Sequence, residues 1–355
     1  MNLDELANSC GEWLSGKGPS SDIVISSRIR LARNLASYRF VRCCSESERE
    51  EIERDVRQVI ASSPVLASME YLEVDELNQL DRQFLMERQL ISRELAESAG
   101  ARGVAIDPQE QHSVMVNEED HLRIQVMHSG LDLEAAWEHI NRLDDALEDR
   151  LTYAFHERFG YLTACPTNVG TGMRVSVMVH LPALVLLRQI DRLFRSLQKI
   201  NLAVRGLYGE GSQAMGDFYQ ISNQVTLGRS ERELIEQVGD VVPTIIEYEK
   251  RARDAYVAEN LDDLRRRIDG AFETLCHADS ISSEETMHLL STVRMGVNLE
   301  LVDRVAISVI NQLFIRTQPA HLQKLRGAEL DTAERNVERA NYVQRFLQAG
   351  SSERN

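Results

Sequence analysis

The stretch MRVSVMVHLP, residues 173–182, limits the fold most sharply, because its residues alternate in the way that a half-buried strand requires. Successive side chains of a strand point to opposite faces of a sheet. One predicted face carries Val175, Val177, Val179 and Leu181, and the other carries Arg174, Ser176, Met178 and His180. HSVMV (112–116), LRIQVMHS (122–129) and DFYQIS (217–222) predict further strands. A sheet with one apolar face needs helices packed against that face.

Helical spacing fills most of the remaining chain. Helices are predicted at 45–63, where serines precede glutamates, and at 79–99, 131–151 and 184–199. From about Leu234 onward amphipathic helical spacing dominates, apart from a short strand-like apolar run at 301–310. We therefore predict an α+β fold, with a mostly antiparallel sheet flanked by helices and followed by an α-helical C-terminal domain. The predicted divisions are an N-terminal segment at 1–22, a sheet domain at 23–250 and a helical domain at 251–355.

Charge and cysteine content narrow the class of protein. The formal net charge of −16 over 355 residues disfavours general binding to nucleic acid or to an anionic membrane. No apolar run approaches the roughly 18 residues that a membrane span needs, and the N-terminus lacks a signal-like stretch, so we expect a cytoplasmic protein. The five cysteines are irregularly spaced and odd in number, which argues against a disulfide framework.

Charged residues of both signs gather at the predicted strands. Glu118, Glu119 and Asp120 stand together in VNEEDHL (116–122), where they form either a solvated turn or a site for a cation. Five arginines lie at strand faces or strand ends: Arg28, Arg30, Arg123, Arg174 and Arg205. A single surface arginine is more often only an ion-pair partner, but a set of planar, permanently charged guanidinium groups suits the oxygens of a phosphate.

The loop CPTNVGTGMR (165–174) adds a possible thiolate to the carboxylate cluster and the arginines. Thr167 lies two positions after Cys165 and can donate to a thiolate, although a lone cysteine is usually an inert core residue. The chain contains neither a GxxxxGKS/T loop nor the GxGxxG loop of protein kinases. If a nucleotide binds, the arginines must hold it.

Four ordered motifs resemble the phosphagen (guanidino) kinase family. They are SSRIRLARN (26–34), VNEEDHLRI (116–124), CPTNVGTGMR (165–174) and RGLYGEGS (205–212). Within that family, RGLYGEGS followed by ISNQVTLG is similar to the bacterial enzymes that phosphorylate arginine in proteins. The resemblance implies a phosphagen-kinase-like catalytic domain at 23–250.

The resemblance also implies roles by position. Glu119, Glu210 and Cys165 would be catalytic, with Glu119 orienting the guanidinium and accepting its proton. Glu118 and Asp120 would hold Mg2+ through water. Gln89 stands where the bacterial enzymes carry a histidine. The implied nucleotide-binding set is Ser26, Ser27, Arg28, Ile29, Arg30, Gln89, Arg123, Arg174, Val175, Ser176, Val177, Met178, Arg205, Gly206, Leu207, Tyr208, Gly209 and Glu210.

We therefore expect an ATP-dependent kinase that phosphorylates arginine side chains in proteins. Only 25 residues precede Ser26, which leaves no room for the N-terminal lid domain of small-molecule guanidino kinases. Two alternatives stay open: a kinase for free arginine or another small guanidino compound, and a weakly active adaptor that binds phosphoarginine. The resemblance further implies a homodimer and, as partners, a zinc-binding activator, a heat-shock repressor and a ClpC-type unfoldase of bacterial stress control.

RNVERA (335–340) is a final candidate site. Arg335 and Arg339 are four positions apart and would share one face of a helix. That face is either solvated, with Asp331 paired to Arg335, or it binds an anion. The segment resembles the RDxxRA motif with which bacterial protein-arginine kinases bind phosphoarginine, which implies an allosteric site at Arg335, Asn336 and Arg339. Asn336 replaces the aspartate of that motif.

Overall fold

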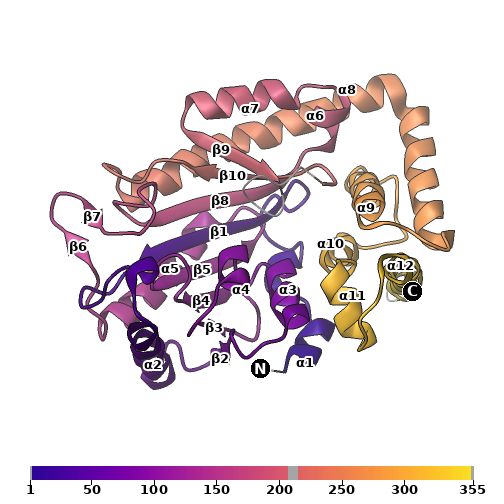
Figure 1. The fold of residues 1–355 in the computed structure, drawn as a ribbon. Coiled ribbons are helices and arrows are strands. Elements are labelled where there is room, and N and C mark those ends of the chain that lie inside the picture. Colours follow the sequence, from indigo (N-terminus) through magenta and orange to yellow (C-terminus); the bar gives the residue numbers. More distant parts are fainter. Residues whose placement is uncertain (1, 207–214, 353–355) are drawn as a thin grey trace.

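An eight-stranded antiparallel sheet forms the centre of the protein (Figure 1). The structure is a computed structural model that describes residues 2–206 and 215–352. The strands lie in the order β2-β3-β4-β5-β1-β8-β10-β9. Their bounds are β1 Val24–Arg33, β2 Glu70–Glu73, β3 Gly103–Ile106, β4 His112–Val116, β5 Leu122–Ser129, β8 Met173–His180, β9 Leu202–Gly206 and β10 Phe218–Asn223. A separate hairpin joins β6 (Phe155–His156) to β7 (Gly160–Tyr161).

The two faces of this sheet differ as the alternation in sequence predicts. Ile29 of β1 pairs with Val126 of β5 and with Val175 of β8, and all three side chains are buried in the main core. The same core includes residues of α2 (Glu46–Ser62), α5 (Leu133–Glu148) and the first part of α8 (Glu231–His277). The opposite face carries polar side chains at its centre, and apolar residues of the same face, such as Met127, Met178 and Met115, pack into two smaller cores.

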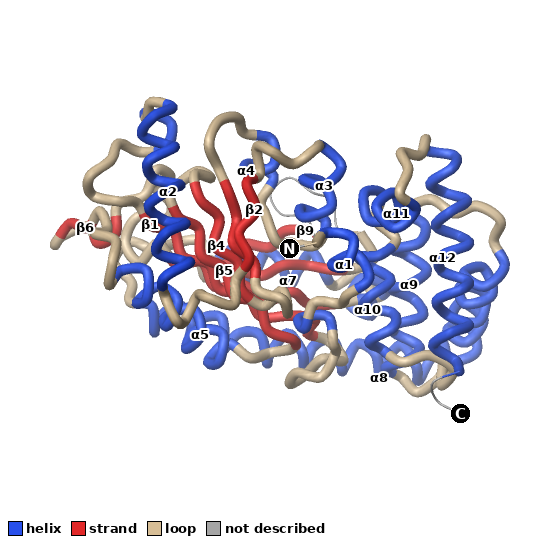
Figure 2. Tube along the Cα trace, turned by 90° about the horizontal axis from the view of Figure 1, so that it is seen from below, coloured by secondary structure: helices blue, strands red, loops and turns tan. Residues whose placement is uncertain are grey.

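Helices flank the sheet and form the C-terminal part, which confirms the predicted α+β class (Figure 2). Ser45 and Glu48 form a capping box at the start of α2, as the serine-glutamate pattern indicates. The remaining helices are α1 Leu3–Asn8, α3 Gln79–Glu87, α4 Arg93–Glu97, α6 Pro182–Leu186, α7 Ile190–Lys199, α9 Ser283–Asn298, α10 Ile307–Arg316, α11 Pro319–Arg326 and α12 Thr332–Ser352, with single turns η1 Glu12–Leu14 and η2 Val41–Cys43. None of the helices within residues 2–206 and 215–352 combines the length and apolar character that crossing a bilayer requires.

Three local predictions are wrong. The helix predicted over 79–99 is divided into α3 and α4, because Gln89 adopts a left-handed backbone with φ of 63° and ends the helical run. Arg188, with φ of 57°, divides the helix predicted over 184–199 in the same way. The apolar run at 301–310 is not a strand but a loop that leads into α10.

The helix α8 crosses the predicted domain boundary at 250/251 without ending there. It extends over 47 residues, and its helical dihedral angles are interrupted at Asn260. Helices α9, α10 and α12 then form a second core around Leu290, Leu313 and Val343. That core also contains Trp13 of the N-terminal segment and Met178 of β8, so the C-terminal helices continue the packing of the sheet.

Glu87 joins the sheet part to the C-terminal helices. Its side chain is buried at the end of α3, and its two carboxylate oxygens accept hydrogen bonds from the backbone N–H groups of Ala320 and His321 at the start of α11, both at 2.9 Å. A carboxylate at this position satisfies N–H groups that have no partner within their own helix. Burial raises the pKa of Glu87 to about 7, although these hydrogen bonds act in the opposite direction.

We expect Glu87→Gln to destabilise the protein by about 1–3 kcal/mol, because the amide turns a donor toward one of the two buried backbone N–H groups. Chemical denaturation followed by circular dichroism measures the change. Glu50→Gln, on the exposed side of α2, is the matched control and should leave the midpoint unchanged. Equal midpoints for the two variants would show that Glu87 contributes nothing to the join.

Candidate active site

Four of the five predicted arginines lie together on the polar face of the sheet. Arg30 of β1 pairs with Arg174 of β8, and Ala32 of β1 pairs with Arg123 of β5. Side chains that pair directly across an antiparallel ladder point to the same face, and Arg28, two positions before Arg30, points there too. We call this set, with Arg205, the arginine face.

Burial and mutual repulsion both act on the arginine face. Burial, followed by the charges of Arg123 and Arg174, lowers the pKa of Arg28 to about 9. Burial, followed by the charges of the other three arginines, also lowers the pKa of Arg30. The nearby carboxylate of Glu118 acts in the opposite direction and raises the pKa of Arg30. A buried cluster of like charges is stabilised when an anion binds against it.

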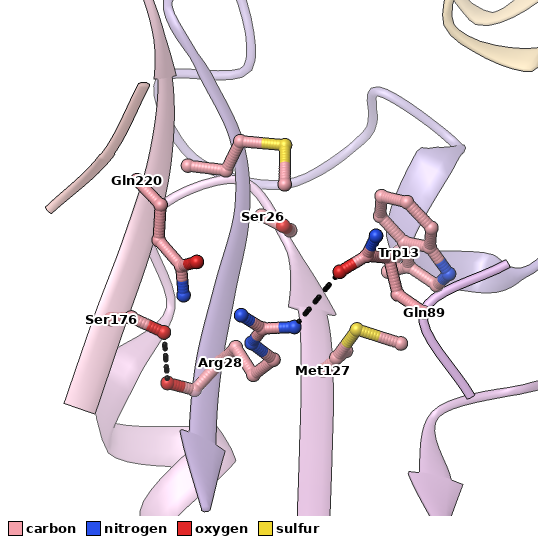
Figure 3. A pocket seen from close by; sticks show the side chains of 8 residues that line it. Trp13, Ser26, Arg28, Gln89, Met127, Ser176 and Gln220 are labelled. Atoms are coloured by element: carbon pink, nitrogen blue, oxygen red, sulfur yellow. Dashed lines mark hydrogen bonds between the residues drawn. The ribbon is translucent and has the colours of Figure 1, made fainter. Parts of the chain in front are cut away.

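A small hollow with room for about one water molecule lies at one end of the arginine face (Figure 3). It is lined by Trp13, Ser26, Arg28, Gln89, Met127, Ser176, Met178 and Gln220. Arg28 donates from Nη1 to Oε1 of Gln89 at 3.1 Å, and Gln125 donates from Nε2 to the backbone carbonyl of Gln89 at 2.7 Å. The left-handed turn at Gln89 therefore presents both its amide and its carbonyl to the sheet. Gln220 pairs across the ladder with Arg205 of β9, which extends the same face to the edge of the sheet.

The carboxylate triplet forms the turn between β4 and β5, at the end of the arginine face. Glu118 is buried and accepts hydrogen bonds from Nη1 of Arg123 and from the hydroxyl of Ser92, both at 2.5 Å. Burial alone would raise the pKa of Glu118, but Arg123 and Ser92 outweigh it and lower that pKa. Glu118 is therefore an ionised partner of the arginine face.

Asp120 connects this turn to the loop that carries Cys165. Its Oδ1 atom accepts hydrogen bonds from Nδ2 of Asn34 and from the backbone N–H of Ala164, both at 2.6 Å. Asn34 also donates to the carbonyl of Leu162 and accepts from the N–H of His121. Burial raises the pKa of Asp120, although the hydrogen bonds oppose that shift.

Asn34 thus joins two of the sequence motifs and the segment just before Cys165, a role that we did not predict from sequence. Its position as the last residue of SSRIRLARN was the available signal. Trp13 was missed as well, because nothing in the sequence near it suggests that the N-terminal segment reaches the arginine face.

Glu119 and Cys165 are both partly exposed. Burial, followed by the charges of Glu118 and Asp120, raises the pKa of Glu119. Within residues 2–206 and 215–352, no side-chain hydrogen bond engages the Glu119 carboxylate. The sulfur of Cys165 lies 3.0 Å from the hydroxyl of Thr167, which is the pairing that the sequence predicts. A carboxylate and a thiol are therefore available to a substrate beside the arginine face.

The residues present suit a metal ion that is held mainly by its substrate. In the described part of the chain no group of three or more acidic, histidine or cysteine side chains could hold a metal ion. Asp120 and Glu118 each have a protein partner, but each carboxylate keeps acceptor capacity for water. Mg2+ is commonly bound through one or two carboxylates, several waters and the phosphates of a nucleotide, and this arrangement fits that pattern.

Several residues of the predicted nucleotide-binding set do not reach the arginine face. Ile29, Val175 and Val177 are fully buried in the core on the other side of the sheet, so their side chains support the strands and cannot contact a ligand at this face. Ser27 is buried and donates to the carbonyl of Gly130. Gly206 ends β9. Leu207, Tyr208, Gly209 and Glu210 lie outside the described residues.

Arg335 and Arg339, predicted as an allosteric pair, are both engaged with α12 and its neighbours. Arg339 is buried and donates to the carbonyls of Thr317 and Ile281 and to Oδ1 of Asn336. Arg335 donates to the carbonyl and hydroxyl oxygens of residues 330 and 332, and no ion pair with Asp331 is present in the described part of the chain. Asn336 thus holds one guanidinium group in place despite replacing an aspartate.

Comparison with known proteins identifies the family. A model described as "ATP:guanido phosphotransferase, C-terminal catalytic domain" matches residues 51–252. A lombricine kinase structure aligns with a TM-score of 0.58 at 29% identity over 66% of this chain and 68% of its own. A duplicated taurocyamine kinase from Schistosoma mansoni aligns with a TM-score of 0.60 at 26% identity over 66% of this chain and 34% of its own. The chain belongs to the ATP:guanido phosphotransferase family, and it is a kinase with ATP as substrate.

The relatives place it within one branch of that family. A protein-arginine kinase from Halothermothrix orenii is 44% identical over 98% of this chain and 99% of its own, and one from Symbiobacterium thermophilum is 46% identical over 98% and 100%. A second model, described as "Protein-arginine kinase McsB C-terminal domain", matches residues 261–355. The chain belongs to the protein-arginine kinases.

Arg174→Ala should weaken ATP binding about tenfold to a hundredfold, because a charge-assisted hydrogen bond contributes roughly 1.5–3 kcal/mol. Isothermal titration calorimetry with Mg-ATP measures the change. Arg42→Ala is the control, since the side chain of Arg42 is 73% exposed and lies 3.9 Å from Glu94. Equal losses in both variants would mean that general charge, rather than the arginine face, holds the nucleotide.

Proposed function

We propose that this chain is an ATP-dependent kinase that transfers the γ-phosphoryl group of ATP to the guanidino group of arginine side chains in proteins. The observation that carries the proposal is the junction of the arginine face with Glu119. At this junction the arginine face, which suits a polyanion such as ATP, adjoins the Glu119 carboxylate, which is available to a cationic guanidinium group. The names of the relatives support the same acceptor.

In the proposed mechanism the arginine face binds the triphosphate. Arg28, Arg30, Arg123, Arg174 and Arg205 neutralise its charge and the charge that develops on the phosphoryl group during transfer. ATP binding also relieves the repulsion among these buried guanidinium groups. The arginines lie on β5, β1, β8 and β9 of one continuous sheet, so the geometry of the face is fixed before the nucleotide arrives.

Glu119 would act on the acceptor. A guanidinium is a poor nucleophile, because it is protonated at neutral pH and its lone pair is delocalised. Glu119 orients the group and takes its proton, so that the freed nitrogen lone pair attacks the γ-phosphorus while the bond to the β,γ-bridging oxygen breaks and ADP leaves. Cys165, together with Glu210, would hold the other edge of the guanidinium.

Magnesium belongs to this proposal as the ion that accompanies ATP. When bound, it supplies positive charge to the phosphate oxygens. Glu118 and Asp120 would contact it through water, and each would keep its partner within the protein. Because Glu118 also pairs with Arg123, the same carboxylate would link the metal side of the site to the arginine face.

The proposal extends to regulation and setting. It includes a 23–250 catalytic domain, a helical C-terminal domain that dimerises, and a cytoplasmic role in stress control with a zinc-binding activator, a heat-shock repressor and a ClpC-type unfoldase. Arg335, Asn336 and Arg339 would form the allosteric phosphoarginine site. Since Arg339 is buried, ligand binding there would require it to release the carbonyls of Thr317 and Ile281.

The deciding experiment incubates the enzyme with Mg-ATP and a basic protein and detects phosphoarginine by mass spectrometry under conditions that preserve acid-labile phosphate. We expect phosphoarginine in the protein. Glu119→Gln should reduce the rate by a hundredfold or more while ATP binding survives, because the carboxylate acts on the acceptor. Glu76→Gln, on an exposed turn, is the control.

Other results would select the alternatives. Phosphorylation of free arginine alone indicates a small-molecule kinase. Binding of phosphoarginine without phosphoryl transfer indicates an adaptor. Near-normal turnover by the Glu119→Gln variant would remove Glu119 from the mechanism.

The pH dependence provides an independent check on Glu119. Since the carboxylate must be ionised to accept a proton, activity should fall as the pH drops through its pKa. That pKa is raised above the ordinary glutamate value of about 4.3, so the acid limb of kcat/KM should have its midpoint above that value. ATP affinity measured over the same range corrects for titration of the nucleotide. An acid limb whose midpoint lies at or below the ordinary glutamate pKa would contradict the role of Glu119 as the proton acceptor.

A further inference from the structure

An open hollow of about 600 Å3 lies beside the candidate active site, between the β6–β7 hairpin and the segment that leads into α8. Its apolar walls are strongly exposed. Phe155 is 59% exposed, Leu227 is 51% exposed, and Phe159 is 41% exposed. We call this hollow the hairpin groove. Apolar side chains that gather on a surface in this way mark a site of interaction more often than scattered ones do.

The floor of the hairpin groove is fixed from below. The guanidinium carbon of Arg33 lies 3.6 Å from the centre of the Tyr161 ring, which lines the groove. Arg33 is itself buried, forms an ion pair with Asp144 at 2.7 Å, and donates from Nη1 to the carbonyl of Thr171 at 2.8 Å. The Tyr161 ring stacked on Arg33 and the backbone of Thr171 bonded to it give the groove a rigid floor before any partner binds.

Three backbone segments meet at the groove too closely for side chains. A Cβ atom on Gly160 would lie 2.4 Å from the carbonyl oxygen of Gly170. A Cβ atom on Gly170, whose φ is +114°, would lie 2.6 Å from the carbonyl oxygen of Thr226. The hairpin, the CPTNVGTG loop and residues 226–228 are therefore packed into one unit.

The same unit carries the thiol of the candidate active site. Thr226 is hydrogen-bonded through its hydroxyl to the carbonyls of Thr167 and Val169, at 2.9 and 2.7 Å. The hydroxyl of Thr167 contacts the sulfur of Cys165. The groove begins at Gly170, five residues from Cys165, a stretch that spans at most about 17 Å when extended. A polypeptide whose arginine reaches Cys165 can therefore place a nearby residue in the groove.

The charges at the groove differ from those of the whole chain. Arg158 and Arg229 line it and are exposed, whereas the carboxylate of Glu231 turns inward to within 3.7 Å of Arg33. Arg229 also lies 3.9 Å from Glu233, so Arg158 is the main source of positive charge at the rim in a protein of net charge −16. An acidic side chain fits this rim better than a basic one.

We propose that the hairpin groove binds the substrate polypeptide beside its target arginine. It takes an apolar side chain within about five residues of that arginine, preferably next to an acidic residue. The inference rests on the proposed function, because it describes which arginine residues of a protein substrate the kinase would phosphorylate. The β6–β7 hairpin that borders the groove lies at the end of the molecule opposite the C-terminal helices (Figures 1 and 2), so those helices do not cover it.

The test uses the full-length enzyme and synthetic peptides that each contain one arginine in a Gly/Ser background. One series places a single leucine at each position from five before to five after the arginine, with and without an adjacent aspartate. A reference peptide contains no leucine. Values of kcat/KM are measured for the unaltered enzyme, for Phe155→Ser and Leu227→Ser in the groove, and for Val65→Ser as control. Val65 is 51% exposed, as Leu227 is, but lies outside the groove.

We expect at least one leucine position to raise kcat/KM about tenfold over the reference peptide, mainly through KM. Phe155→Ser and Leu227→Ser should abolish that gain and leave both the reference peptide and the KM for ATP unchanged. Val65→Ser should preserve the gain. Arg158→Ser should remove only the additional effect of the aspartate.

Three results would overturn the inference. If all peptides react equally with the unaltered enzyme, the groove does not bind substrate, although the proposed function stands. If Leu227→Ser changes the oligomeric state in analytical ultracentrifugation and spares the leucine preference, the groove is a contact between copies of the chain. If neither peptides nor proteins acquire phosphoarginine, the proposed function fails and this inference fails with it.

Discussion

Placing several guanidinium groups on one half-buried face of a sheet is the constraint on which this protein depends. Burial and mutual repulsion lower the pKa of Arg28 and of Arg30, and Glu118 offsets only part of that charge. The strands can hold such a face because their other side is packed in the main core. Binding of a polyanion would relieve this repulsion, so the core on one side of the sheet would support the nucleotide binding that we propose on the other.

The acidic turn completes this arrangement by bringing opposite charge to the border of the arginine face. Glu118 and Asp120 are fixed by partners within the protein, which leaves Glu119 as the carboxylate that faces outward. The phosphoryl donor and the guanidine acceptor would therefore meet where the electrostatic environment changes sign. Asn34 sets that border, since it connects the end of β1 to the turn and to the Cys165 loop.

The sequence predicts most of the sheet because alternation of apolar and polar residues along a strand indicates which of its faces is buried. The alternation in MRVSVMVH was sufficient to place Arg174 and Val175 on opposite faces of β8. Left-handed residues such as Gln89 have no comparable signal, since only tertiary contacts stabilise that conformation. The same holds for Trp13, which reaches the arginine face from a segment distant in sequence, and for Arg339, whose burial depends on carbonyls of other helices.

The kink in α8 coincides with the boundary between the two matched family models. The two matched family models end at residue 252 and begin at residue 261, and the interruption at Asn260 falls at the edge of that interval. Residues on both sides of it, including Ile246 and Leu264, are buried in the main core. Because the helix is kinked at Asn260, an exchange of the C-terminal module at this point would have to preserve the packing of Leu264 in the main core, but not a continuous helical phase.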